Sequence, residues 1–220
     1  MNNYESILIL HALDSSTDFL KKNFDSFKTY YHCFDSSHES VGQAINLIQN
    51  LNNTSLIIYL GHGSSYALYI PDESYENEFI NITKCNNLFS GQDVILLSCN
   101  SKDLLKNIRT TNFAIGFGNI ISSVYELDHY NKYNEDKLMI ADEYKDIVVS
   151  EFNAIYSQAC FKAIERLINN DIHFYDIPKT ISFLVNKKIN EIILDSSMSY
   201  KKSLSKLLFD FRDQITLIRN

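Results

Sequence analysis

Two short stretches decide the fold of this chain: residues 56–63, LIIYLGHG, and residues 94–101, VILLSCNS. In each, a run of apolar residues leads directly into small and reactive ones. A run of four or five apolar residues is too short for a helix and is typical of a strand buried on both faces of a parallel sheet. The two stretches therefore predict two central strands, each ending in a loop that carries a reactive side chain.

The rest of the first two thirds alternates between the same two patterns. Short apolar runs predict further strands at residues 7–10, 30–34 and 113–117, and amphipathic segments predict helices at 19–24, 36–51, 85–89 and 102–108. Residues 66–70 and 78–82 alternate apolar with polar and predict a small hairpin, or flap. Strands that alternate with helices indicate a three-layer α/β/α sandwich with a mostly parallel sheet.

After about residue 140 the period changes to about 3.6, which predicts helices at residues 144–167, 177–188 and 200–215. Residues 119–140, rich in Tyr, Asn and Asp, are predicted to form a long loop. No repeat or linker divides the chain. We expect one domain over residues 1–220, with a core at about 5–165 and a C-terminal helical part at about 166–220.

Charge and composition exclude several classes of function. The formal net charge of −7 and the lack of a basic face disfavour nucleic acid as a partner. No apolar run reaches the ~18 residues of a membrane span, and the N-terminus lacks the basic region of a signal peptide. Four cysteines scattered through the chain form neither a disulfide framework nor a zinc motif. We expect a cytoplasmic, reduced protein without metal or cofactor, in which Cys33, Cys85 and Cys160 belong to the core.

His62 and Cys99 follow the two most apolar strands, 37 residues apart. Ligands of open parallel sheets bind beyond the carboxyl ends of the central strands, and neighbouring strands lie only about 4.8 Å apart. A thiolate is a good nucleophile that an imidazole can activate, and backbone N–H groups beside glycine can stabilise an oxyanion. The pattern therefore predicts an acyl-transfer site.

These two motifs, in this order, resemble those of the caspase-like cysteine peptidases (clan CD), and above all the bacterial CHAT-domain proteases. In that group an apolar block ends in His-Gly and a second one ends in a small residue and Cys. The resemblance covers roughly residues 5–165. It implies a caspase-like sheet and a cysteine endopeptidase (a thiol protease) in which Cys99 is the nucleophile and His62 the general acid/base. The N–H groups of Gly63 and Cys99 would form the oxyanion hole.

The resemblance also implies where substrate binds. In family members that cleave after basic residues, an acidic residue follows the first strand, where Asp14 stands, or lies two positions before the cysteine. The second position is Leu97 here, a departure from that pattern. Glu126 and Asp128, in the loop after the Gly116 strand, are the further acidic candidates. We expect a protein substrate cleaved after a basic residue.

Small proteases of the CHAT type serve in bacterial (antiviral) defence, where a triggered sensor protein activates them. The resemblance thus implies an activating partner that orders the flap at 66–80 and the loop at 119–140. Nucleic acid and membrane are not expected as partners.

Other interpretations of the same residues stay open. Cys99 is equally compatible with a buried core position, and Asp14 with a helix cap. The chain as a whole could be a catalytically silent caspase-like fold that acts as a protein-interaction module. A receiver-like or flavodoxin-like domain is a further alternative, although the acidic cluster and lysine of receivers are missing. The GxSxG, GxxxxGK[ST] and GxGxxG motifs are absent.

Overall fold

A six-stranded sheet forms the centre of the molecule in the computed structural model, which describes residues 4–72, 76–135 and 137–220. The strand order is β2-β1-β3-β6-β7-β8, and every neighbouring pair is parallel except β7 and β8. The strands are β1 (Ser6–Ala12), β2 (Tyr31–Phe34), β3 (Ser55–Leu60), β6 (Asp93–Leu97), β7 (Phe113–Gly116) and β8 (Thr216–Arg219). The prediction of an α/β fold with a mostly parallel sheet is confirmed.

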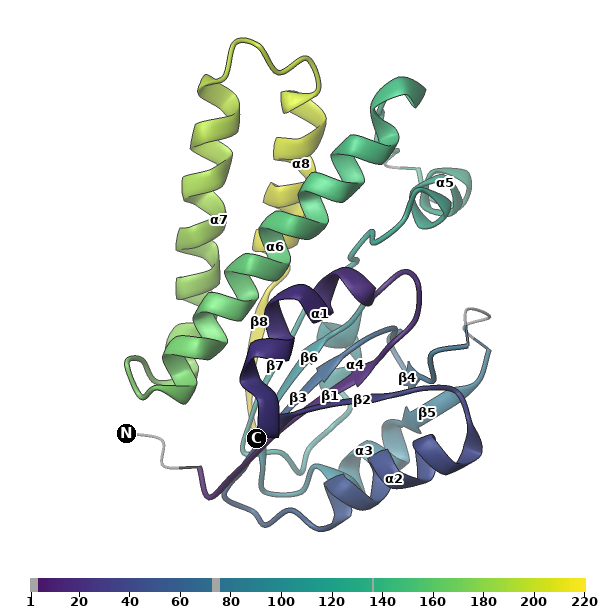
Figure 1. The fold of residues 1–220 in the computed structure, drawn as a ribbon, viewed down its shortest axis with the longest axis vertical. Helices are drawn as coiled ribbons and strands as arrows, with labels where there is room; N and C mark the ends of the chain where they lie inside the picture. The colour runs from purple at the N-terminus through teal and green to yellow at the C-terminus, as the bar shows by residue number, and fades with distance from the viewer. Residues whose placement is uncertain (1–3, 73–75, 136) are drawn as a thin grey trace.

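Helices cover both faces of this sheet (Figure 1). α1 and α6 lie on one face, with α7 and α8 packed behind α6, and α2, α3 and α4 lie on the other. The helices are α1 (Asp18–Phe24), α2 (His38–Gln49), α3 (Ile82–Leu88), α4 (Ser101–Leu105), α5 (Val124–Tyr133), α6 (Lys145–Ile168), α7 (Ile177–Leu194) and α8 (Lys201–Asp213), with 3-10 turns at Asp25–Tyr30, Asp142–Tyr144 and Phe174–Asp176. The arrangement is compatible with a three-layer sandwich.

The two central strands, β3 and β6, contain uninterrupted apolar runs because both of their faces are buried. Successive side chains of a strand point to opposite faces. Leu56, Ile58 and Leu60 of β3 pack into the core under α1 and α6. Ile57 and Tyr59 of the same strand pack into the core under α2 and α3. Every residue of β3 and β6 is buried, as predicted for central strands.

The predicted flap is present as a two-stranded antiparallel hairpin, β4 (Ala67–Tyr69) and β5 (Glu78–Asn81). Its connection, including residues 73–75, falls partly outside the described residues. An isolated bridge pairs Gly63 with Leu68, so the hairpin begins directly at the end of the His62 loop.

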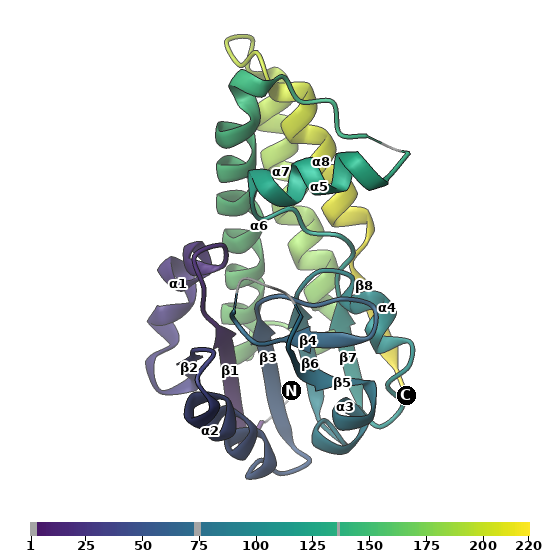
Figure 2. The ribbon, with the colours of Figure 1, turned by 90° about the vertical axis from the view of Figure 1, so that its right-hand side faces the viewer.

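One prediction for the later part of the chain is wrong, and one strand there was not predicted. Residues 119–140 are not one long loop, because they contain α5. Ser123 starts this helix: its side chain accepts a hydrogen bond from the N–H of Glu126. The other miss is β8, which follows α8 and pairs antiparallel with β7. Figure 2 shows α5 lying across the carboxyl end of the sheet, above the strands that carry the predicted site.

Among the helices of the described residues, none combines the length and the apolar character required to cross a membrane.

Candidate active site

The structure brings His62 and Cys99 to one cavity. β3 and β6 are adjacent and parallel, with Leu60 opposite Leu97, so both residues lie two positions beyond the paired strand ends. The N–H of Gly61 donates to the carbonyl oxygen of Leu97 at 3.3 Å and holds the two loops together. His62 and Cys99, together with Gly63, line a cavity of about 410 Å³. The predicted adjacency of the two motifs is confirmed.

The glycines around His62 are required by close approach. Gly61 has a φ of +152°, and a Cβ there would lie 2.8 Å from the Cβ of Ala12. A Cβ on Gly63 would lie 2.7 Å from the hydroxyl oxygen of Ser98. Real side chains do not tolerate such distances, so only glycine lets the His62 loop pack against the loop that carries Cys99.

His62 is buried, and its imidazole is held from both sides. Nε2 lies 2.9 Å from Oδ2 of Asp14 and 2.7 Å from the hydroxyl of Ser16. An ionised carboxylate can only accept, so the contact with Asp14 places a proton on Nε2. Nδ1 faces the cavity, 3.7 Å from Oε1 of Glu126. This geometry leaves Nδ1 as the ring nitrogen that can exchange a proton inside the cavity.

Asp14 therefore does not lie where the sequence predicted. Its side chain is 3% exposed and faces His62, and Asp14 is not among the residues that line the cavity, so the structure places it beside the histidine and not where the predicted substrate contact would be. Its other oxygen, Oδ1, accepts from the backbone N–H groups of Ser16 and Thr17, which fixes the turn before α1. Burial tends to raise the pKa of Asp14, but the hydrogen bonds from His62 and Ser16 outweigh burial and lower it to about 2.

The lowered pKa of Asp14 predicts that the free energy of unfolding decreases at acidic pH. Its folded pKa of about 2 lies below the ordinary value of 3.8, so the stabilisation is present above pH 3.8 and disappears as pH falls toward 2. We expect the free energy of unfolding of the wild type to fall more steeply between pH 4.5 and 2.5 than that of Asp14→Asn. Urea titrations at these two pH values measure the difference. Equal losses in both proteins would contradict the prediction.

Cys99 stands at a sharp turn from β6 into α4. The next residue, Asn100, has a left-handed φ of 53°, which turns the chain at once and leaves Cys99 at the cavity wall. The thiol donates to the carbonyl oxygen of Ile120 at 2.8 Å. Burial and, second, the negative charge of Glu126 together raise the pKa of the Cys99 thiol to about 12, against a smaller lowering by the hydrogen bond to Ile120. In this conformation the side chain of Cys99 is a thiol, not a thiolate.

Gly63 lines the cavity and lies opposite Leu68 of the flap. The two bonds that hold it opposite Leu68 come from its neighbours: the N–H of Ser64 donates to Ala67, and the N–H of Tyr69 donates to the carbonyl of His62. In this kind of antiparallel pair the central residue uses neither its N–H nor its C=O. Its N–H is therefore not used by the flap, as an oxyanion donor requires.

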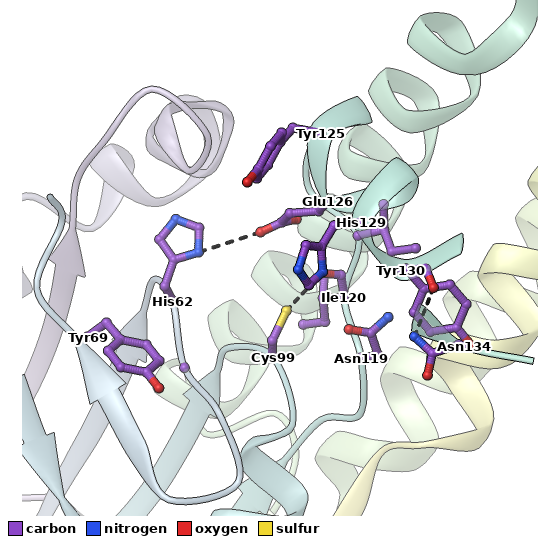
Figure 3. Close-up of a pocket in the computed structure, with 12 residues that line it drawn as sticks. His62, Tyr69, Cys99, Asn119, Ile120, Tyr125, Glu126, His129, Tyr130 and Asn134 are labelled. Atoms are coloured by element: carbon purple, nitrogen blue, oxygen red, sulfur yellow. Dashed lines mark hydrogen bonds and ion pairs between the residues drawn. The ribbon is translucent and has the colours of Figure 1, made fainter. Parts of the chain in front are cut away.

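The two remaining acidic candidates lie in different environments. Glu126 lines the cavity, on the first turn of α5, and its side chain faces His62 (Figure 3). Asp128 does not line the cavity. It is exposed and pairs with Lys145 at 2.7 Å, so the structure places the predicted substrate-binding residue Asp128 outside the cavity.

Several aromatic residues of the cavity wall were not predicted from the sequence. Tyr69 comes from the flap, and Tyr125, His129 and Tyr130 come from α5. The ring centroids of Tyr125 and His129 lie 6.4 Å apart, and those of His129 and Tyr133 lie 4.6 Å apart. Their spacing of four residues is a helical signal. It was missed because the segment was interpreted as a loop.

All four cysteines are free, and Cys85 and Cys160 are buried as predicted. Cys33 is exposed on β2, so its assignment to the core is wrong. Within residues 4–72, 76–135 and 137–220, no three His, Cys, Asp or Glu side chains are grouped so that they could hold a metal ion.

Comparison with known proteins adds little to this geometry. No protein-family profile matches the sequence, and no solved structure matches the fold at a significant level. A segment of 86 aligned residues is 31% identical to tRNA(Ile)-lysidine synthase of Mycoplasma mycoides subsp. mycoides SC. The alignment covers 34% of this chain and 21% of that enzyme, so the chain spans about a fifth of its relative's length. A match of this extent does not show a family.

Proposed function

We propose that this protein is a caspase-like cysteine endopeptidase with a His62–Cys99 dyad. One observation carries the proposal: the two residues follow adjacent parallel strands, 37 residues apart, and line one cavity with Gly63. The sheet with helices on both faces, the flap after the His62 strand and the His-Gly and Ser-Cys strand ends support it. The comparisons neither favour nor oppose it.

The chemistry follows from the positions of the groups. Nδ1 of His62 takes the thiol proton, and Sγ of Cys99 attacks the carbonyl carbon of the scissile peptide bond. The N–H groups of Gly63 and Cys99 stabilise the resulting oxyanion. When the tetrahedral intermediate collapses, the imidazolium gives its proton to the leaving amine and a thioester remains. Water then hydrolyses the thioester, which releases the carboxylate product and restores the thiol.

Asp14 takes a positioning role in this mechanism. Lying 2.9 Å from Nε2, its carboxylate favours a proton on that nitrogen, leaves Nδ1 toward the cavity and stabilises the imidazolium that forms during the reaction. The arrangement of nucleophile, base and orienting carboxylate is the general pattern of an activated nucleophile.

We propose a basic residue on the amino side of the cleaved bond, because Glu126 is the acidic side chain that lines the cavity with Cys99. The aromatic rings of Tyr125 and Tyr130 can flank the long aliphatic part of a lysine or arginine side chain. The resemblance to CHAT-domain proteases adds a role in bacterial defence, with a protein substrate and an activating sensor.

A covalent probe tests the proposal directly. An acyloxymethyl-ketone peptide with arginine at the reactive position is expected to label the wild type, and labelling is expected to disappear in Cys99→Ala and fall strongly in His62→Ala. Mass spectrometry of the labelled peptide identifies the modified residue. A folded wild type that reacts with neither this probe nor its aspartate and alanine analogues would instead support a silent interaction module.

A further inference from the structure

One short segment binds both members of the dyad. Residues 120–126, which run from the end of the sheet into α5, are called the latch below. At its start, the carbonyl oxygen of Ile120 accepts the thiol hydrogen bond of Cys99 at 2.8 Å. At its end, Oε1 of Glu126 lies 3.7 Å from Nδ1 of His62. Both atoms needed for proton transfer thus face latch groups (Figure 3).

The carboxylate of Glu126 is fixed in this direction. Its other oxygen, Oε2, accepts from the N–H and the hydroxyl of Ser122 at 2.6 and 2.7 Å. The carbonyl of Ser122 in turn accepts from Nδ2 of Asn153 on α6 at 2.7 Å. Because two hydrogen bonds hold Oε2, the orientation of the carboxylate is fixed, and its other oxygen, Oε1, points at His62.

The charge of Glu126 also acts on the thiol. Cys85 is fully buried and its pKa is raised to about 12 by burial alone. The pKa of Cys99 is also raised to about 12, mainly by burial, and here the charge of Glu126 is a second cause in the same direction. A negative charge beside a thiol disfavours the thiolate.

We propose that Glu126 is a specificity switch: in the free protein its carboxylate pairs with Nδ1–H of the protonated His62 ring, which then cannot take the thiol proton, and the cationic side chain of a substrate draws Glu126 away. This inference rests on the proposed peptidase function. A guanidinium or ammonium group in the cavity forms a full ion pair with Glu126, so the same contact that selects a basic residue also releases Nδ1 of His62. An uncharged side chain of similar length fills the cavity without releasing the ring.

The surroundings allow the latch to rearrange locally. A second cavity of about 800 Å³ lies between α1 and α6 and is bordered by Ser122, Ser123 and Val124. The latch is therefore not packed solidly on that side. Ile121, near the start of the latch, and Leu127, directly after its end, are buried in the core. The expected movement is a rearrangement of residues 122–126 with the ends of the segment in place.

The first test measures the thiol without any peptidase chemistry. Iodoacetamide alkylation of each cysteine is followed by mass spectrometry at pH 8 in the wild type, Glu126→Gln and Asp128→Asn. Glutamine keeps an acceptor for Ser122 but removes the charge. We expect faster alkylation of Cys99 only in Glu126→Gln, by about tenfold for each unit by which the pKa falls. Cys85, which has no carboxylate partner, is the internal control, and its modification would reveal unfolding.

The second test compares two acyloxymethyl-ketone probes that differ only in charge, one with arginine and one with norleucine at the reactive position. The switch predicts that Glu126→Gln slows labelling by the arginine probe and accelerates labelling by the norleucine probe. A carboxylate that only binds the cation would slow the first and leave the second unchanged. Asp128→Asn, on the same helix, is expected to match the wild type with both probes.

The outcomes separate the switch from the peptidase function. Unchanged alkylation of Cys99 in Glu126→Gln, or no gain with the norleucine probe, overturns the switch while labelling of the wild type still supports the peptidase. A different result would be faster alkylation of Cys99 in Glu126→Gln while neither probe labels any variant. That result overturns both the peptidase function and the specificity switch. It supports only the electrostatic effect of Glu126 on the thiol.

Discussion

Replacement of Cys99 with alanine is expected to reduce hydrolysis of an arginine-containing peptide by on the order of 10⁴–10⁶-fold in kcat, because no other group in the cavity can form the thioester. The measurement is release of a fluorophore from a peptide amide with arginine or lysine before the reporter. The side chain is small and partly exposed, so thermal unfolding of the variant is expected to stay close to that of the wild type.

Cys33→Ala is the matched control for this loss. Cys33 is an exposed cysteine on β2, outside the cavity, and its removal leaves the dyad intact. Hydrolysis that survives in Cys99→Ala but disappears in Cys33→Ala would exclude the dyad. Hydrolysis that survives in both would point to a contaminating protease or to another nucleophile.

Replacement of Asp14 with asparagine is expected to lower kcat by about 10²–10⁴-fold with little change in KM. Its carboxylate lies 2.9 Å from Nε2 of His62, and the loss of an orienting carboxylate beside a catalytic histidine costs up to about 10⁴ in serine proteases. An asparagine keeps a carbonyl oxygen for the N–H groups of Ser16 and Thr17, so the turn before α1 is preserved.

The comparison with Thr17→Ala decides what Asp14 does. The hydroxyl of Thr17 donates to the carbonyl of Ala12 and belongs to the same turn without touching His62. If Asp14 only stabilises the turn, Asp14→Asn should be nearly as active as the wild type and Thr17→Ala should be the weaker enzyme. If Asp14 binds the substrate's cation, Asp14→Asn should raise KM and weaken the preference for arginine over norleucine.

The sequence predicted the elements that carry the site because their signals are local. An apolar run such as LIIYL can be satisfied only by burial on both faces, so its central position follows from composition alone. Gly61 and Gly63 likewise indicated a place where two backbone segments pack closely. The structure shows this close packing of Gly61 against Ala12 and of Gly63 against Ser98. For this reason the position of His62 and Cys99 beyond the ends of neighbouring strands could be predicted.

The elements that were missed depend on distant partners. β8 is four residues long and half exposed, and it is stabilised as a strand by pairing with β7, about a hundred residues earlier in the chain. α5 has a polar and aromatic sequence with weak helical signals. Its N-cap at Ser123 and the burial of Leu127 against the core favour the helix.

The sequence by itself determined the parallel sheet, its central strands and the two reactive residues at their ends, since all of these follow from the spacing of apolar, glycine and reactive positions along the chain. Only the tertiary structure decided the roles of the carboxylates. Asp14, Glu126 and Asp128 look alike as acidic candidates, but they face His62, the cavity and Lys145, respectively. A carboxylate acts through whatever lies within a few ångström of it, and that neighbourhood is made by segments far apart in the sequence.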